Sequence, residues 1–464
     1  MLNLVKEHKQ EQVLEFLQEL DDKHKEMLIQ QVQNIDFDLL QYCTGLLNSS
    51  HEVAHYVHGT LQPTEVVELP RTEVEKEKYK QAIAAGEALI AAGKAGVVLV
   101  AGGQGTRLGF DAPKGMFPVG PVTQRTLFQY HTEKIIAREK RCRAAIPFYI
   151  MTSDLNYDQT VAYFEENNYF GKDKDTFVFF KQGMLPPLSS DGKMFLSEKY
   201  QVAMAPDGHG GLLRAMKNNG IVDDMRRRGL EVVYYFQVDS PLANVCDPAF
   251  LGFHQVKGAE MSAKTVYKAD PYEKLGNVGV LDGKTVVIEY TELSKEEMEA
   301  VNPNGRLKFG QGSIGIHVFS VDFLHRMNSE KIQLPYHIAH KKIPYISPDG
   351  DRFDPEKPNG FKFEQFIFDA LPLAKQVLIM ETDRQHDFSP IKNKDGIDSP
   401  ATARRDLCNL FGQWLEAAGL PLNRDDNGNV TDRIEISPLY ALDEQEFVAN
   451  KPVLSGTGQS ILFE

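Results

Sequence analysis

Cysteine is scarce in this sequence, and its few copies form no pattern. Cys43, Cys142, Cys246 and Cys408 are spread over 464 residues and include no Cys-x-x-Cys pair. Disulfide frameworks and thiolate zinc sites are built from clustered cysteines, so we expect neither of them here. A reducing compartment suits such a chain.

Long apolar runs and an excess of positive charge are missing as well. No stretch reaches the ~18 apolar residues of a membrane-spanning helix, and Met1 to Lys9 carries charges where a secretion signal has an apolar core. The chain has 51 Lys and Arg against 65 Asp and Glu, a formal net charge of −14. Broad binding to nucleic acid or to a membrane is therefore not expected. We expect a cytoplasmic protein in which a polyphosphate ligand would meet a local cluster of cations.

Strand and helix patterns alternate through the middle of the chain. A continuous apolar run at 97–101 is followed by glycines and then by a helical pattern at 126–138. Such alternation predicts an α/β fold with a mixed, mostly parallel, Rossmann-like sheet. Further strands are predicted at 146–151, 176–180 and 232–238, and further helices at 157–167 and 212–228.

The two ends of the chain have different patterns. Apolar residues at helical spacing in the first ~50 residues predict a small helical region, and another helix is predicted at 79–92. A helical pattern at 401–418 and a turn-rich stretch with Asp426-Asn427-Gly428-Asn429 predict a small C-terminal α+β unit. We therefore expect a helical region at 1–85, a catalytic α/β domain at 86–386 and an α+β domain at 387–464.

The first predicted strand leads into a glycine loop. Residues 102–107 read Gly-Gly-Gln-Gly-Thr-Arg, and Pro113-Lys114 follows. Glycines let backbone N–H groups approach a phosphate chain closely, and an adjoining helix N-terminus would add its dipole. The dinucleotide fingerprint and the Walker pattern are both absent. Arg107 and Lys114 would supply a forked donor and a point charge to a triphosphate. A tight turn with two solvated cations is the alternative.

This loop resembles the Gly-Gly-x-Gly-Thr-Arg…Pro-Lys motif of nucleotide-sugar pyrophosphorylases, most closely that of the eukaryotic-type UDP-N-acetylhexosamine pyrophosphorylases. The resemblance implies a nucleotidyltransferase core of the nucleotide-diphospho-sugar transferase type and a Mg²⁺-dependent uridylyltransferase. Such an enzyme joins UTP to a hexose 1-phosphate and releases pyrophosphate. Further segments match the family in the same order at 182–186, 204–211, 238–239, 288–290, 341–345, 357–360 and 388–393.

The resemblance also assigns roles to the matched residues. Asp239 would hold Mg²⁺, and its place at the end of a predicted strand suits a ligand site, although a turn aspartate before Pro241 is the alternative. A sugar 1-phosphate is already an anion, so catalysis would consist of positioning and charge neutralisation. The implied UTP-binding residues are Gly102, Gly103, Gly105, Gln182, Gly208 and Asp239; the catalytic ones are Arg107, Lys114 and Lys392; the sugar-binding ones are His209, Gly279, Glu289, Tyr290 and Ser313.

The identity of the sugar stays open. The resemblance favours N-acetylglucosamine 1-phosphate, but His209 and Ser313 stand where these enzymes typically carry asparagine. Serine is shorter than asparagine, and histidine is bulkier and titratable, which changes the hydrogen bonds available to a sugar. Comparable or better use of glucose or galactose 1-phosphate is therefore the alternative. The sequence carries no signal for an oligomeric state.

Two other functions compete with a uridylyltransferase. His51-Glu52-Val53-Ala54-His55 matches the zinc-protease pattern, but Gly59 and Pro63 would end such a helix quickly, so an exposed polar helix is expected. A UDP-sugar sensor would bind without turnover, yet it would not need the cations of a pyrophosphate site. Residues 423–434 resemble a calcium loop but lack an acid at the first and twelfth positions, so a turn is expected there.

Overall fold

The computed structural model describes residues 2–49, 59–329, 332–454 and 460–464. The chain divides into two compact units, each assembled from separate segments. The minor unit comprises Met1–His58, Gln182–Ala215 and Gln333–Asp369, and the major unit comprises Gly59–Lys181, Met216–Ile332 and Ala370–Glu464. The predicted three-part division, with boundaries at 85/86 and 386/387, stays a prediction.

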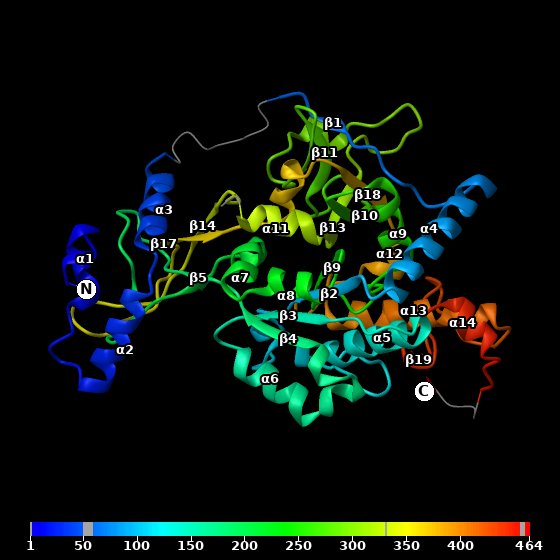
Figure 1. Ribbon diagram of the computed structural model, residues 1–464, viewed down its shortest axis with the longest axis horizontal. Helices are drawn as coiled ribbons and strands as arrows, with labels where there is room; N and C mark the ends of the chain where they lie inside the picture. Colours follow the sequence, from blue (N-terminus) through cyan, green and yellow to red (C-terminus); the bar gives the residue numbers. More distant parts are fainter. Residues whose placement is uncertain (1, 50–58, 330–331, 455–459) are drawn as a thin grey trace. The chain divides into compact units, whose positions relative to one another are not determined.

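The major unit is built around a mixed ten-stranded sheet (Figure 1). Its parallel half has the order β9-β2-β3-β4, and β13 runs antiparallel to β9 on the other side. Every residue of β3 and all but the last of β2 are buried, as expected for strands that helices cover on both faces. The predicted mixed α/β sheet is confirmed. Its strands are β1 (Gln62–Pro63), β2 (Ala95–Val100), β3 (Phe148–Thr152), β4 (Phe177–Lys181), β9 (Val232–Gln237), β10 (Met261–Tyr267), β11 (Asn277–Leu281), β12 (Lys284–Ile288), β13 (Gln311–Ser320) and β18 (Val377–Glu381).

Strand order places a topological switch point between β2 and β9. The chain crosses from β2 to β3 on one side, whereas β9 lies on the other side of β2 and parallel to it. Ligands of open α/β sheets bind at the carboxyl ends of the strands at such a point. The glycine loop follows β2 and Asp239 follows β9, so both predicted phosphate-site segments lie at this position.

The helices of the major unit begin at side-chain caps where the sequence supplies them. Thr72 and Glu75 form a capping box at the start of α4, and Ser399 and Thr402 form one at the start of α13. Instead of one helix at 212–228 there are two, because Gly220 adopts a left-handed conformation (φ +64°) between them. The helices are α4 (Glu73–Ala91), α5 (Leu127–Cys142), α6 (Tyr157–Glu166), α8 (Ile221–Arg227), α9 (Pro248–Lys257), α10 (Lys295–Glu299), α11 (Val321–Ser329), α12 (Arg384–Asp387), α13 (Pro400–Ala417) and α14 (Glu444–Ala449). Helix α7 (Leu212–Asn218) begins within the residues of the minor unit and ends within those of the major unit.

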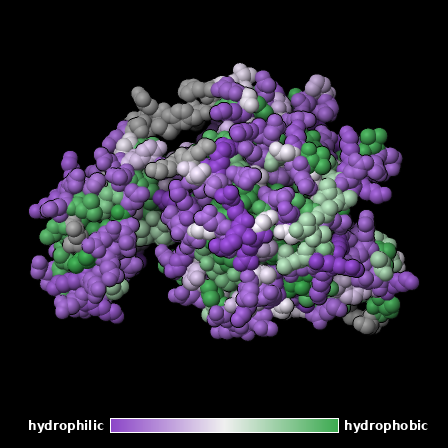
Figure 2. Space-filling view, viewed as in Figure 1, coloured by the Kyte–Doolittle hydropathy of each residue, from purple (hydrophilic) through white to green (hydrophobic). Residues whose placement is uncertain are grey.

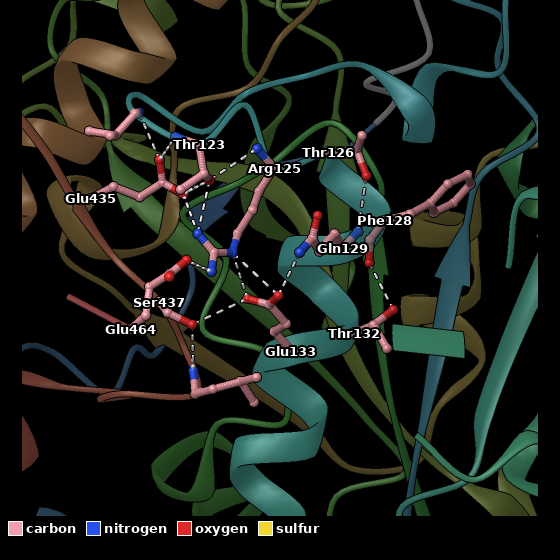
Figure 3. A network of polar contacts seen from close by, with 12 residues as sticks. Thr123, Arg125, Thr126, Phe128, Gln129, Thr132, Glu133, Glu435, Ser437 and Glu464 are labelled. Atoms are coloured by element: carbon pink, nitrogen blue, oxygen red, sulfur yellow. Dashed lines mark hydrogen bonds and ion pairs between the residues drawn. The ribbon is translucent and has the colours of Figure 1, made fainter. Parts of the chain in front are cut away.

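A buried arginine joins the C-terminal residues of the major unit to the segment after the glycine loop (Figure 3). The Arg125 guanidinium contacts Glu133 (3.1 Å), Glu435 (2.9 Å) and Glu464 (2.7 Å). Glu435 also accepts hydrogen bonds of 2.7 Å from the backbone N–H groups of Val122 and Thr123. Glu464 directly follows β20 (Ser460–Phe463), which pairs with β19 (Arg433–Ile436). This small sheet is thereby fixed to the residues that precede α5.

The minor unit has N-terminal helices α1 (Leu2–Glu7), α2 (Asp22–Gln33) and α3 (Phe37–Ser49). Val13, Leu28 and Val32 share a core with Leu185 and Phe363, so the helices pack on residues from the middle of the chain. The apolar residues at 13–20, expected in a helix, form a short 3-10 turn at Glu11–Leu14 and bends. The strand pairs of this unit are β5 (Met184–Leu185) with β8 (Ala205–Pro206), β6 (Leu196–Glu198) with β7 (Gln201–Val202), β14 (His337–Lys341) with β17 (Gly360–Glu364), and β15 (Tyr345–Ile346) with β16 (Arg352–Phe353).

The described ranges contain no helix that combines the length and the apolar character needed to span a membrane. Hydrophilic residues cover most of the face seen in Figure 2, and apolar residues appear there in scattered groups.

Candidate active site

Three consecutive backbone N–H groups of the glycine loop have no hydrogen-bond partner among the described residues. Asn156 donates a 2.9 Å hydrogen bond to the carbonyl of Ala101, and the Lys114 N–H donates one of 3.1 Å to the carbonyl of Gly103. Within the part of the chain that the structure describes, the N–H groups of Gly102, Gly103 and Gln104 donate no hydrogen bond. Consecutive free N–H groups of this kind form a site for an anion.

The packing of the fold requires glycine at 105 but not at 103. A Cβ at Gly105 would lie 2.7 Å from a ring carbon of Phe110, so the fold itself requires glycine there. A Cβ at Gly103 would meet no atom within 4 Å, so packing does not require this glycine and the space beside it is open to a ligand. The UTP contact of Gly105 stays a prediction.

No α-helix begins at the loop. Short 3-10 helices at Thr106–Leu108 and Lys114–Met116 follow it, and the next α-helix, α5, begins only at Leu127. The prediction that an adjoining helix N-terminus adds its dipole to the loop is therefore wrong. The features that would suit an anion here are the N–H groups that donate no hydrogen bond among the described residues and the nearby cations.

Two lysines surround the carboxylate at the end of β9. Lys114 Nζ lies 3.1 Å from Asp239 Oδ2, and both side chains are mostly buried, with exposed fractions of 17% and 14%. Burial alone would raise the pKa of Asp239, but Lys114 and Lys392 outweigh it and hold the pKa of this carboxyl below its usual value. Arg107 is exposed on the same loop and forms no ion pair within the described ranges. Three of the predicted residues, Lys114, Asp239 and Lys392, therefore lie together.

A buried ion cluster fixes the segment that carries Lys392. The ammonium of Lys264, which is fully buried, lies 2.7 Å from Asp247 Oδ2 and 2.6 Å from Asp387 Oδ2. Asp387 also accepts a 2.8 Å hydrogen bond from the N–H of Asn244 and one of 3.2 Å from Ser240 to its carbonyl. The residues before Lys392 are thus held against the residues after Asp239.

The predicted sugar-binding residues of the major unit lie around the start of β11. The N–H of Ser313 donates a 2.8 Å hydrogen bond to the carbonyl of Gly276, and a Cβ on Gly276 would lie 3.8 Å from Glu289 Oε1. Tyr290 follows and is half-buried. Gly279 is paired with β1 and β12, and a Cβ there would lie 2.7 Å from a Leu61 methyl. Packing therefore accounts for this glycine, and its contact with the sugar stays a prediction.

The remaining predicted residues, Gln182, Gly208 and His209, belong to the minor unit. Gln182 is only 9% exposed, and its amide has no hydrogen-bond partner among the described residues, which suits recognition of an outside donor and acceptor. Gly208 has φ +83°, and a Cβ there would lie 2.4 Å from the carbonyl oxygen of Gln365. The fold therefore requires glycine at 208.

His209 is a neutral imidazole in this structure. Its Nδ1 accepts a 3.2 Å hydrogen bond from the N–H of Ile367, and its ring stacks on Phe366 with centroids 5.3 Å apart. Burial, with the nearby His337, lowers the pKa of His209 to about 4. The histidine is therefore bulky but not titratable near neutral pH, and Nε2–H is the donor it can offer to a ligand.

Asp239 can supply one ligand to a metal ion. No group of three or more His, Cys, Asp or Glu side chains in the described ranges could hold a metal by itself. Mg²⁺ is usually bound through one or two carboxylates together with substrate phosphates, so a single carboxylate beside a phosphate site fits it. The histidines at 51 and 55 lie outside the described residues. Asp425 accepts hydrogen bonds from the N–H groups of Asn427 and Asn429, which confirms a turn there.

Asn156, Lys264, Asp247 and Asp387 were not identified from the sequence. Asn156 contacts Ala101, 55 residues away, and Asp387 contacts residues 123 and 143 positions away, so no local spacing reveals these contacts. Asp247 and Lys264 are 17 residues apart. Two of the four have a local signal. The carboxamide of Asn156 accepts a hydrogen bond from Ser153, just after β3, and Asp247 caps the start of α9 before Pro248.

Comparisons with known proteins bear on the family and the fold of this chain. A family model described as UTP–glucose-1-phosphate uridylyltransferase matches residues 46–409. The chain is 40% identical over 423 residues to UDP-N-acetylglucosamine pyrophosphorylase of Saccharomyces cerevisiae, covering 88% of this chain and 86% of that protein. It is 38% identical over 452 residues to UDP-N-acetylhexosamine pyrophosphorylase-like protein 1 of Xenopus tropicalis, covering 92% and 86%. The crystal structure of the Trypanosoma brucei uridine diphosphate N-acetylglucosamine pyrophosphorylase with an inhibitor has a TM-score of 0.84 at 26% identity, covering 100% of this chain and 97% of that one.

Proposed function

The chain belongs to the UTP–glucose-1-phosphate uridylyltransferase family, and from this premise we propose that it joins UTP to N-acetylglucosamine 1-phosphate, with release of pyrophosphate. The observation that carries the proposal is the grouping of Lys114, Lys392 and Asp239 beside the free N–H groups of the glycine loop. The names of the relatives favour the acetylated sugar over glucose or galactose 1-phosphate.

The reaction requires an attacking anion, a leaving anion and the neutralisation of their charge. A phosphate oxygen of the sugar 1-phosphate attacks the α-phosphorus of UTP, and the bond from the α-phosphorus to the bridging oxygen breaks as pyrophosphate leaves. The N–H groups of Gly102 and Gly103 orient the phosphates, and Arg107, Lys114 and Lys392 stabilise the departing charge. Asp239 would hold Mg²⁺ at this site, and the ion would supply further charge neutralisation. Lys114 exchanges its contact with Asp239 for a phosphate when UTP and Mg²⁺ bind.

A pyrophosphate-release assay tests the proposal. The purified chain is incubated with UTP, Mg²⁺ and, in turn, N-acetylglucosamine, N-acetylgalactosamine, glucose and galactose 1-phosphates. We expect turnover that is fastest with N-acetylglucosamine 1-phosphate and that is lost when EDTA removes the metal. Absence of turnover with all four sugars would rule out the enzyme, whereas retained UDP-sugar binding in that case would favour a sensor.

Replacing Gln182 by alanine is expected to weaken the preference for UTP over CTP. The buried Gln182 amide has no hydrogen-bond partner among the described residues, so it is available to pair with the imide edge of uracil, and CTP presents a different donor pattern. We expect kcat/KM for UTP to fall about tenfold or more, with a smaller change for CTP. Gln201→Ala, an exposed glutamine of the same unit, is the control. Unchanged discrimination between UTP and CTP would contradict the assignment of Gln182.

Asparagine at both 209 and 313, the two predicted sugar-binding positions where the family typically carries it, is expected to favour the acetylated sugar. The neutral His209 offers only Nε2–H to a ligand, whereas an asparagine amide both donates and accepts. His209→Asn with Ser313→Asn should raise the ratio of kcat/KM for N-acetylglucosamine 1-phosphate over glucose 1-phosphate by up to about tenfold. Each single variant serves as a control. An unchanged ratio would show that neither side chain contacts the acetamido group.

A further inference from the structure

A cavity of about 470 Å³ opens in the major unit, apart from the glycine loop and its two lysines. It lies among α5, α9, α13 and α14, and none of residues 102–114, 239 or 392 lines it. Phe411 and Trp414 of α13, both mostly buried, form part of its apolar wall. Its volume falls in the range of small-molecule sites in proteins.

Two cations stand one turn apart on α5 at the polar side of this cavity. Arg138, only 3% exposed, donates a 3.2 Å hydrogen bond from Nη2 to Asn244, and its buried Nε has no partner. The Lys134 ammonium lies 2.6 Å from the carbonyl oxygen of Pro241 and 2.8 Å from that of Ala243. Neither cation forms an ion pair with any described residue. Among the described residues, their hydrogen-bond acceptors are neutral, and the buried Nε of Arg138 has no partner.

The lining carboxylates form their ion pairs with other cations, and Arg138 acts on Asp443 through charge alone, without an ion pair. Asp443 is 2.6 Å from Arg141, and Asp247 is 2.7 Å from Lys264, so each already has its own cation. Glu444 is exposed and Glu87 is half-buried, and neither contacts the two cations. A guanidinium stays charged at any physiological pH, and burial without a counter-charge is unfavourable. Burial also lowers the pKa of Lys134 to about 7, with partial compensation by Asp387.

We propose that this cavity is a second binding site, which takes a small organic anion. The charged group of the ligand, a carboxylate, sulfonate or phosphate, pairs with Arg138 and with Lys134. Its aromatic or aliphatic body packs against Phe411 and Trp414. The guanidinium fork suits a flat or tetrahedral oxyanion, and a bound anion removes the electrostatic cost of the two buried cations. The site does not depend on the proposed reaction.

The fluorescent probe 1-anilinonaphthalene-8-sulfonate tests this site on the intact chain. We expect saturable binding at one site, with a Kd at least about tenfold weaker in Arg138→Met, which removes the charge but keeps an apolar stem. Lys140→Met removes an exposed cation from the same helix and should leave the Kd unchanged. Arg138→Lys should recover part of the affinity. The neutral analogue N-phenyl-1-naphthylamine should bind wild type and Arg138→Met equally.

Competition in the wild-type protein gives a test that needs no variant. Naphthalene-1-sulfonate should displace the probe, whereas the neutral naphthalene-1-sulfonamide should not, and saturating UTP with Mg²⁺ should leave it bound. Three results would overturn the proposal: no saturable binding, equal displacement by the charged and neutral compounds, or displacement by UTP, which would place the probe at the nucleotide site. Because the readout is binding, failure of the proposed reaction in the pyrophosphate assay is a separate result.

Discussion

Alanine at Lys114 and, separately, at Arg107 is expected to lower kcat by about 10²–10³-fold, the usual cost of removing a donor from developing charge. Lys114 is mostly buried and lies 3.1 Å from Asp239, so its ammonium is already held where phosphates would bind. Arg107 is exposed and has no ion-pair partner in the described ranges, so its guanidinium is available to a ligand. The measurement is pyrophosphate release at saturating UTP and sugar 1-phosphate.

The two variants should differ in stability, which separates a chemical role from a structural one. Removing Lys114 leaves the mostly buried Asp239 with only Lys392 nearby, so a lower Tm is expected together with the lower kcat. Arg107→Ala should lower kcat at an unchanged Tm. Lys94→Ala, at the amino end of β2 and paired with Glu231, is the matched control and should keep full activity. Near-normal turnover in both Arg107→Ala and Lys114→Ala would show that the loop is a structural turn without a catalytic role.

Local patterns in the sequence predict the parallel half of the sheet well. The runs at 97–101 and 232–238 are buried strands, and the end of each carries a predicted phosphate-site residue. Motif matching brings Lys114, Asp239 and Lys392 together correctly although they are 125 and 153 residues apart. It succeeds because all three segments end at one edge of the sheet.

Interactions between distant segments are what the sequence does not reveal. The core shared by Val13 and Phe363 depends on the return of the chain to the minor unit, which no local periodicity indicates. Gly220 interrupts a pattern that otherwise continues as one helix, since a single glycine with positive φ is enough to end it. Glycine at 105 suggests a phosphate contact, but a Cβ added at this position would collide with Phe110. A glycine that packing requires and a glycine that binds a ligand therefore look alike in sequence.

Replacing Lys264 by methionine is expected to destabilise the fold by about 3–5 kcal/mol, the typical cost of breaking a buried ion pair. Its ammonium is the cation shared by Asp247 and Asp387, at 2.7 and 2.6 Å. Methionine fills similar volume, so the loss is mainly electrostatic: two buried carboxylates remain beside each other without their cation. The free energy of unfolding, measured by urea denaturation at pH 7, tests this value. Lys284→Met, an exposed lysine at the start of β12, is the control.

The pH dependence of stability should change sign in this variant. In the wild type, burial would raise the pKa of Asp387, but Lys264 and the hydrogen bonds outweigh it and the pKa is lowered. The ionised carboxyl therefore stabilises the fold above its unfolded pKa, and this contribution is lost as the pH falls through the lower folded value. Without Lys264, the folded pKa of one carboxyl should rise above its unfolded value, so protonation stabilises the variant as the pH falls. The loss in free energy of unfolding of Lys264→Met relative to the wild type should then become smaller between pH 7 and pH 5. The loss in Lys284→Met should stay near zero. A deficit that is constant over this range would show that the loss comes from packing and not from two unpaired carboxylates.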